Sequence, residues 1–263
     1  VPYARYSETL ESVTAEIEGL PETFNRAELQ SLLPAGAARN AVDCALWDLE
    51  AKRAGKRVWE LAGLDAPKPE ITAYTLSLAA PAEMEEKARE NAHRPLLKIK
   101  LGGGDEDLDR LRAVRRGAPK AKIVVDANEG WTVDLYQKIA PLLLELGVAM
   151  VEQPLPAGDD EALRGIERPL PVCADESCHD SASLASLHGK YDMINIKLDK
   201  TGGLTEALLL KSAAIEAGFE VMMGCMIGTS LGMAPAVLAA QGAAVTDLDG
   251  PLLLARDRAN GLT

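Results

Sequence analysis

The sequence is poor in aromatic residues and in positive charge, and both shortages restrict what the protein can do. Phe, Tyr and Trp make up 4% of the 263 residues, while Ala, Leu and Gly dominate, as in helix-rich α/β proteins. The formal net charge is −12, which would repel nucleic acid and anionic membrane surfaces. No apolar run reaches the roughly 18 residues that a membrane span needs. We therefore expect no nucleic-acid partner and no membrane partner.

Cysteine is also scarce, and its positions fit neither a disulfide framework nor a zinc site. The four cysteines are scattered through apparently regular elements and form no CxxC pair. No signal peptide is visible, so we expect a protein of the reducing cytoplasm. Because the sequence opens with Val1 and closes abruptly at Thr263, we expect either end to lack segments. The cysteines are Cys44, Cys173, Cys178 and Cys225.

The first quarter of the chain has the pattern of helices. Apolar residues recur at helical spacing over residues 8–19 and 23–33, and a longer helical pattern over 35–62 is broken at Gly55. Pro67 and Pro69 then mark a boundary. The sequence predicts two domains, 1–66 and 67–263.

From residue 70 onward, short apolar runs alternate with amphipathic helical stretches. Such alternation implies parallel strands joined by right-handed crossovers. Eight units in about 180 residues predict a closed α/β barrel of the TIM-like (β/α)7β type, with an open doubly wound sheet as the alternative. No glycine-rich dinucleotide motif follows the first strand. The predicted strands lie within residues 71–79, 96–101, 122–128, 148–154, 170–177, 193–199, 220–226 and 244–250.

Polar residues recur near the C-terminal end of each predicted strand. In a barrel these ends share one rim, where the active sites of barrel enzymes are built. The regular spacing therefore predicts a single site. Taking one position per strand, they are 75, 100, 126, 152, 175, 197, 225 and 247.

Three of these positions are acids that follow apolar stretches. A carboxylate that ends a buried strand is unfavourable unless it is paired or bound to a metal. Asp126, Glu152 and Asp175 end three consecutive strands, so they would form the oxygen-rich site that suits Mg²⁺. The alternative for each acid is a helix cap or an ion pair with lysine.

Three lysines approach the same rim. Lys98 and Lys100 are two residues apart on one strand, so they share a face, and a neighbouring cation favours a neutral, basic lysine. Lys197 ends the sixth strand, opposite the second strand in an eight-strand ring. Two bases on opposite faces of one carbon suit a racemase or epimerase. The alternative is that these lysines are ion-pair partners of the acids.

The eighth strand adds a pair of carboxylates, Asp247 and Asp249. Away from the acids on the third to fifth strands they would suit a substrate ammonium group, although DLDG is also good turn chemistry. The glycine run at 102–104 is weak support for phosphate binding, since a flexible loop explains it equally well.

These motifs together resemble the muconate lactonizing subgroup of the enolase superfamily, which uses lysine bases and Mg²⁺ to stabilise an enediolate. The stretch at 34–63 is similar to the helical part of that family's capping domain, whose N-terminal strands we expect to be absent here. Within the subgroup, DLDG is similar to the DxD motif of dipeptide epimerases. The other matching motifs are KIK at 98–100, VVDAN at 124–128, VEQPLP at 151–156, ADES at 174–177 and NIKLDKTGG at 195–203.

The resemblance implies a role for each site residue. The three acids would hold one Mg²⁺ ion per subunit, and Lys100 and Lys197 would exchange an α-proton while Lys98 tunes Lys100 and contacts the substrate. Thr75 and Cys225 would line the pocket, and Asp247 and Asp249 would hold the amino end of a dipeptide. The implied activity is L-Ala-D/L-Glu epimerisation in murein peptide salvage.

Two alternatives within the subgroup share the lysines and acids. An o-succinylbenzoate synthase or a cycloisomerase differs mainly in having little use for the DxD pair. Many subgroup members also carry an acid after the seventh strand, where this chain has Gly228. The sequence is compatible with a homo-oligomer and does not define one.

Overall fold

The fold is built on one sheet of eight parallel strands that follow one another in chain order. The computed structural model describes residues 4–104 and 106–261. All eight predicted strands are confirmed, each lying inside its predicted run. They are β1 (Tyr74–Leu76), β2 (Leu96–Lys100), β3 (Lys122–Asp126), β4 (Val148–Glu152), β5 (Val172–Ala174), β6 (Met193–Ile196), β7 (Glu220–Met223) and β8 (Val245–Thr246).

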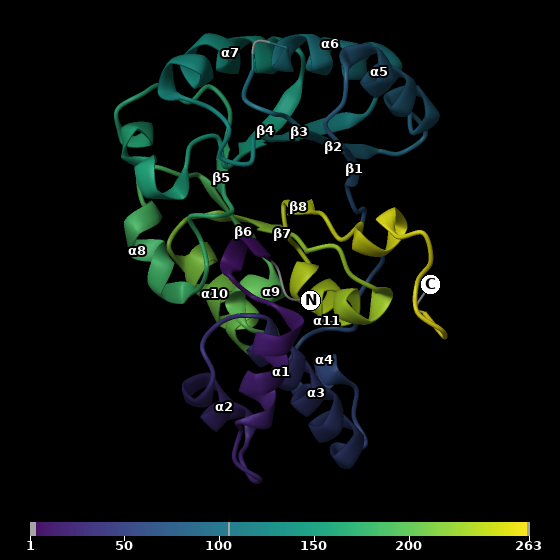
Figure 1. The fold of residues 1–263 in the computed structure, drawn as a ribbon, viewed down its shortest axis with the longest axis vertical. Coiled ribbons are helices and arrows are strands. Elements are labelled where there is room, and N and C mark those ends of the chain that lie inside the picture. Colours follow the sequence, from purple (N-terminus) through teal and green to yellow (C-terminus); the bar gives the residue numbers. More distant parts are fainter. Residues whose placement is uncertain (1–3, 105, 262–263) are drawn as a thin grey trace.

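The sheet is strongly curled, and its first and last strands approach each other. Among the described residues, a parallel bridge joins Thr72, just before β1, to Thr246 of β8. The amide of Ala73 donates a hydrogen bond to the carbonyl of Thr246 at 2.8 Å. The predicted alternation of strands and helices is therefore present (Figure 1).

One apolar cluster fills the inside of this curl at the N-terminal end of the strands. It takes one buried residue from each strand, or from the position just before it in the case of β1. Side chains that meet in this way from all eight strands require the curl. We call this set the lower layer: Ala73, Leu96, Val124, Met150, Cys173, Met193, Met222 and Val245.

Helices cover the outer face of the sheet, as the amphipathic pattern between the strands requires. Figure 1 shows α5, α6 and α7 over the first strands. The Thr132 hydroxyl caps α7 by accepting from the amide of Leu135. The remaining connections include short 3₁₀ turns. The helices after β1 are α5 (Pro81–Glu90), α6 (Asp107–Gly117), α7 (Val133–Glu145), α8 (Leu184–Leu187), α9 (Leu198–Thr201), α10 (Leu204–Glu216) and α11 (Ser230–Ala240).

Between residue 4 and β1, the described chain forms the 3₁₀ helix η1 (Ala4–Tyr6) and the α-helices α1 (Leu10–Glu18), α2 (Arg26–Leu32), α3 (Ala37–Ala54) and α4 (Val58–Leu61). The predicted break at Gly55 is confirmed, because this glycine ends α3 in the left-handed conformation. The helices share a small core of their own, which contains Val13, Leu29, Leu33, Ala37 and Ala38.

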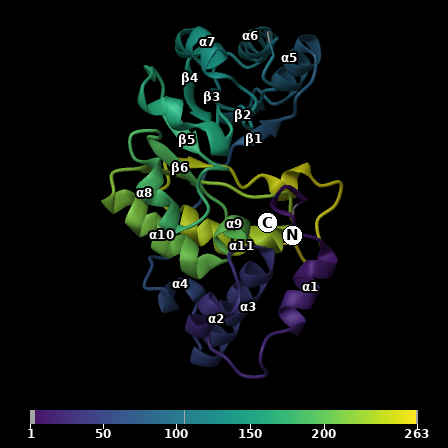
Figure 2. The same cartoon turned by 60° about the vertical axis from the view of Figure 1, so that its left-hand side comes forward.

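These N-terminal helices pack against α9 and α10, on the side of the molecule away from α5–α7 (Figures 1 and 2). Asp43 of α3 accepts from the hydroxyl of Thr205 at 2.6 Å, and Arg39 donates to the carbonyl of Thr201 at 2.7 Å. Gly203 has a φ of +116°, and a Cβ there would collide with Asp43. The N-terminal helices therefore contact α9 and α10 through specific side-chain interactions.

The cysteines and the apolar character of the helices can now be described. All four cysteines are free thiols, as their spacing predicts. Among the residues described, none of the helices combines the length and the apolarity that crossing a membrane would require.

Candidate active site

A cavity of about 580 Å³ opens at the C-terminal ends of the strands. Eight of the ten predicted site residues line it, and the other two, Asp126 and Glu152, are fully buried at the ends of β3 and β4. The structure thus brings the predicted residues to one place. The eight predicted residues that line it are Thr75, Lys98, Lys100, Asp175, Lys197, Cys225, Asp247 and Asp249.

The residues that form the floor of this cavity lie two positions after those of the lower layer on each strand. Moving two residues along each strand returns to the same face, and here the apolar residues give way to polar ones in seven of the eight positions. We call this set the middle layer: Thr75, Lys98, Asp126, Glu152, Asp175, Asn195, Gly224 and Asp247. Lys100 lies two residues after Lys98 on β2, and Lys197 lies two residues after Asn195.

Lys98 is the central cation of the middle layer. Its ammonium lies 2.7 Å from Glu152, 2.9 Å from Asp247 and 3.1 Å from Asp126. Burial lowers the pKa of Lys98, but the three carboxylates outweigh burial and hold it well above its usual value. Lys98 therefore stays positively charged, and three acids compensate its charge. Its neighbour on the same face of β2 is Lys100.

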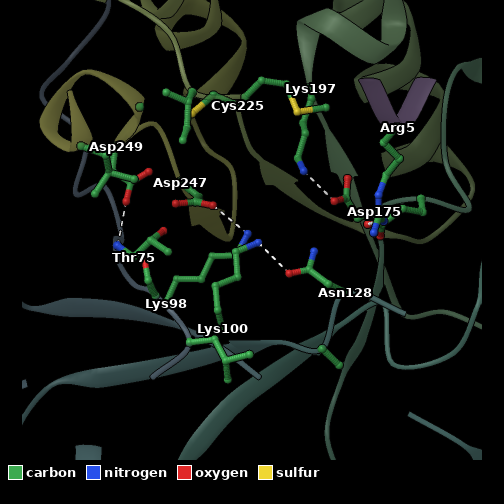
Figure 3. Close-up of a pocket in the computed structure, with 18 of the residues that line it drawn as sticks. Arg5, Thr75, Lys98, Lys100, Asn128, Asp175, Lys197, Cys225, Asp247 and Asp249 are labelled. Carbon is green, nitrogen blue, oxygen red and sulfur yellow. Dashed lines mark hydrogen bonds and ion pairs between the residues drawn. The ribbon is translucent and has the colours of Figure 1, made fainter. Parts of the chain in front are cut away.

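Lys100 and Lys197 reach the cavity from opposite sides (Figure 3). The Lys100 ammonium donates to Asp126 at 2.7 Å and to Asn128 at 2.9 Å. The Lys197 ammonium donates to Asp175 at 2.5 Å. Burial lowers the pKa of Lys197, but Asp175 and Glu152 outweigh burial and leave the pKa above its usual value. The facing arrangement agrees with the prediction, and the ion pairs expected under its alternative are present as well.

The three predicted metal ligands lie at neighbouring strand ends but are bridged by lysines. Within 4–104 and 106–261, no three His, Cys, Asp or Glu side chains are gathered closely enough to hold a metal ion. Lys98 contacts both Asp126 and Glu152, and both carboxylate oxygens of Asp175 accept from lysines.

The carboxylates nevertheless fit a divalent cation. Glu152 Oε2 is buried and lacks a hydrogen-bond partner in the described part of the chain, although Lys98 Nζ is 2.7 Å away. Burial and the nearby Asp126 raise the pKa of Glu152 to about 7. Burial also raises the pKa of Asp126, but Lys98 and Lys100 outweigh it and leave a value of about 2. Three crowded, buried carboxylates are the hard oxygen ligands that Mg²⁺ prefers.

The eighth-strand acids lie on the other side of the cavity, beside Thr75 (Figure 3). Asp249 accepts from the amide of Thr75 at 2.7 Å. Asp247 Oδ2 pairs with Lys98, while its Oδ1 is buried and has no hydrogen-bond partner in the ranges described. Both acids follow β8, and Asp249 directly precedes the short 3₁₀ helix η5 (Gly250–Leu253). Cys225 is half-buried near Gly250.

Several residues of the site were missed by the sequence analysis. Lys200 is buried and donates to Asp175 Oδ1 at 2.6 Å, and Asn195 donates to Glu152 at 2.7 Å. Asn195 could have been found, because it lies two residues before Lys197 on the same strand face. Arg5 and Tyr6 also line the cavity, and nothing in the local sequence pointed to them.

The glycine run at 102–104 has a structural explanation. The amides of Gly102 and Gly103 both donate to the carboxylate of Asp107. A Cβ at Gly103 would lie 1.9 Å from the carbonyl oxygen of Gly130. The run therefore allows the loops after β2 and β3 to touch, and two of its amides are already engaged.

The parallel sheet and the polar motifs at its strand ends occur in a known family of enzymes. Residues 82–251 match the "Enolase C-terminal domain-like" family, and residues 8–63 match the "Mandelate racemase / muconate lactonizing enzyme, N-terminal domain" family. The chain belongs to the mandelate racemase/muconate lactonizing enzyme family of the enolase superfamily.

Within that family the chain is similar to epimerases and racemases of glutamate derivatives. It is 48% identical over 264 residues to the L-Ala-D/L-Glu epimerase of Escherichia coli K12, covering 97% of this chain and 81% of that protein. It is 46% identical over 269 residues to the N-acetyl-D-glutamate racemase of a Pseudoalteromonas species, covering 100% and 85%.

A crystal structure of an enolase family member from Agrobacterium tumefaciens, with homology to dipeptide epimerases and with bound sodium and L-Ala-L-Glu, superposes with a TM-score of 0.97. It is 57% identical and the match covers 100% of this chain and 82% of that one.

Proposed function

We propose that this protein is a Mg²⁺-dependent isomerase that epimerises dipeptides, with L-Ala-D/L-Glu as its substrate. The observation that carries the proposal is the approach of Lys100 and Lys197 from opposite sides of one cavity (Figure 3). The buried acids Asp126, Glu152 and Asp175 lie between them on β3, β4 and the end of β5. Two facing bases with an anion-stabilising centre between them suit inversion at the α-carbon of a carboxylate.

Each residue then has a task. Asp247 and Asp249 bind the substrate ammonium, which fixes the dipeptide with its reacting α-carbon between the two lysines. Lys100 or Lys197, whichever faces the α-hydrogen, removes it, and the other delivers a proton to the opposite face. When held by Asp126, Glu152 and Asp175, one Mg²⁺ ion per subunit supplies a Lewis acid for the substrate carboxylate. Lys98 adds a fixed positive charge to the same region.

We also propose that the N-terminal part of the chain covers the cavity. Residues 1–66 act as a capping domain over a closed barrel formed by residues 67–263. Arg5 pairs with Glu129 at 2.8 Å and also with Glu176, so the N-terminal segment reaches the loops after β3 and β5. The Thr72–Thr246 bridge supports closure of the sheet. The free thiols suit the reducing cytoplasm in which we expect the enzyme to act.

Racemisation of N-acetyl-glutamate is the second candidate, because a relative with that name is 46% identical over the whole chain. An N-acetyl group carries no positive charge, so it would leave Asp247 and Asp249 without a cationic partner. Asp247 Oδ1 is already buried and without a hydrogen bond among the described residues. The acid pair therefore favours a substrate with a free ammonium group.

The test is proton NMR of L-Ala-D-Glu in D₂O with Mg²⁺ and enzyme, with N-acetyl-D-glutamate in a parallel sample. We expect the glutamate α-proton signal to disappear while the L,L diastereomer appears. Exchange without epimerisation would mean that only one lysine acts. Turnover of N-acetyl-D-glutamate alone would replace the dipeptide proposal with the second candidate, and exchange in neither sample, nor with other dipeptides, would reject both.

A further inference from the structure

Gln153 follows the metal-ligand candidate Glu152 and is fully buried, yet it does not line the cavity. Its Oε1 accepts from the amide of Asp175 at 2.9 Å and from the amide of Ser177 at 3.1 Å. Its Nε2 donates to Leu155, Ser177 and Tyr191 at 2.8–2.9 Å. One neutral side chain thus joins the end of β4 to the loop after β5.

The backbone around Gln153 is strained in the way that functional sites often are. Gln153 has a φ of +35°, and Asn128 and Glu129, after β3, have φ values of +45° and +66°. Residues other than glycine rarely adopt such angles. The segments after β3 and β4 support each other, because the amide of Glu129 donates to the carbonyl of Gln153 at 2.8 Å. Gln153 therefore contacts the loops that follow all three acid-bearing strands.

The outer end of this network is anchored by an ion pair. Asp160 accepts from Lys190 at 2.6 Å, and its other oxygen accepts from the hydroxyls of Ser177 and Tyr191 at 2.7 Å. Burial raises the pKa of Asp160, but these hydrogen bonds outweigh burial and lower it. A charged, fixed Asp160 holds Tyr191 and Ser177 where they can accept from Gln153.

We propose that Gln153 is a positioning residue that fixes the separation of the Glu152 and Asp175 carboxylates and thereby sets the affinity of the site for Mg²⁺. It does so through the amide of Asp175, which has no freedom to shift while Gln153 Oε1 holds it. The inference rests on the proposed function for the identity of the ligands. Residues that orient metal ligands from behind typically change metal affinity about 10–100-fold when they are replaced.

The experiment is a calorimetric titration of the full chain with Mg²⁺ in the absence of substrate. Gln153→Met removes all five side-chain hydrogen bonds at similar volume, and we expect Mg²⁺ binding to weaken about 10–100-fold. Tyr191→Phe removes one partner of Nε2 but leaves the contact with Asp175, so we expect a smaller change. Met222→Ala, in the lower layer on β7, should lower the melting temperature without changing Mg²⁺ affinity.

The outcomes separate positioning from stability. A folded Gln153→Met variant that binds Mg²⁺ as tightly as the wild type would overturn the inference, as would equal losses in all three variants. If Gln153→Met does not fold, Gln153→Asn decides by the same titration, because its shorter side chain no longer reaches the amide of Asp175. Wild-type protein that binds no Mg²⁺ also overturns the inference. Wild-type protein that binds Mg²⁺ but leaves the dipeptide unchanged contradicts only the proposed function.

Discussion

The two ends of the sheet interior differ sharply although the same eight strands build both. The lower layer has an apolar residue from every strand. Two residues further along, the middle layer has Lys98, Asp126, Glu152, Asp175 and Asp247, all buried. Burying aliphatic side chains stabilises a fold directly, whereas buried ion pairs often contribute little net stability because charges lose their hydration. The lower layer therefore maintains the curl, whereas the proposed chemistry explains why the middle layer is charged.

The largest expected effect comes from removing one of the two proposed bases above the middle layer. For Lys197→Met we expect epimerisation of L-Ala-D-Glu to fall about 10²–10⁴-fold, since this is the usual contribution of a positioned general acid or base. Exchange of the α-proton in D₂O should persist for the one diastereomer whose hydrogen faces Lys100. NMR of both diastereomers measures this.

The matched control for that variant is Lys211→Met. Lys211 is a half-buried lysine that donates to the carbonyls of Ala239 and Gln241, away from the cavity. It should keep epimerisation near the wild-type rate. Equal exchange from both diastereomers in Lys197→Met would contradict the two-base arrangement.

The second largest effect is expected from a substitution in the apolar lower layer. Met222 is fully buried in the lower layer, and Met222→Ala should reduce the free energy of unfolding by about 2–5 kcal/mol, as buried Met-to-Ala changes do. Because the side chain lies below the middle layer, we expect kcat at a temperature where the variant is folded to stay near the wild-type value. Urea unfolding and steady-state kinetics measure the two quantities. A large loss of kcat with intact stability would contradict the division between the layers.

The third effect concerns recognition of the substrate. Asp249→Asn keeps an oxygen that can accept from Thr75, but it removes the negative charge. A hydrogen bond to a charged group contributes about 1.5–3 kcal/mol, so we expect KM for L-Ala-D-Glu to rise roughly ten- to a hundredfold. Turnover of N-acetyl-D-glutamate, if measurable, should not weaken. Equal loss with both compounds in parallel kinetic assays would argue against an ammonium site.

Much of this division could be predicted from the sequence, because it depends on the local period of a strand. The eight apolar runs and the acids that end three of them were visible directly, as was the facing of strands two and six in a ring. Asn195 was equally accessible from its place on the Lys197 face. Gln153 was not, since its contacts depend on its positive φ, which a sequence pattern does not show.

Contacts between distant segments could not be predicted at all. Lys200 reaches Asp175 only because the short helix α9 turns it back beneath the strand end. Arg5 lies 124 residues from Glu129 in the chain, and only the packing of the N-terminal helices against α9 and α10 brings them together. Nor did the lysine pair show that Lys98 would be surrounded by three carboxylates, from β3, from β4 and from the residue after β8.

The smallest effect on stability should come from the ion pairs at the rim, which contrast with those of the middle layer. The side chain of Arg5 is 40% exposed, and that of its partner Glu129 is 26% exposed. Pairs of this kind contribute about 0.2–1 kcal/mol because water and salt screen them. Arg5 also pairs with Glu176, whose side chain is only 7% exposed, so we expect Arg5→Met to lower the free energy of unfolding by about 1–2 kcal/mol. If the N-terminal segment caps the cavity, KM for the dipeptide should nevertheless rise while kcat changes less. Lys52→Met, which removes the exposed pair with Asp48, is the matched control and should alter neither constant. Unchanged KM in Arg5→Met would mean that this contact holds the rim together without helping to retain the substrate.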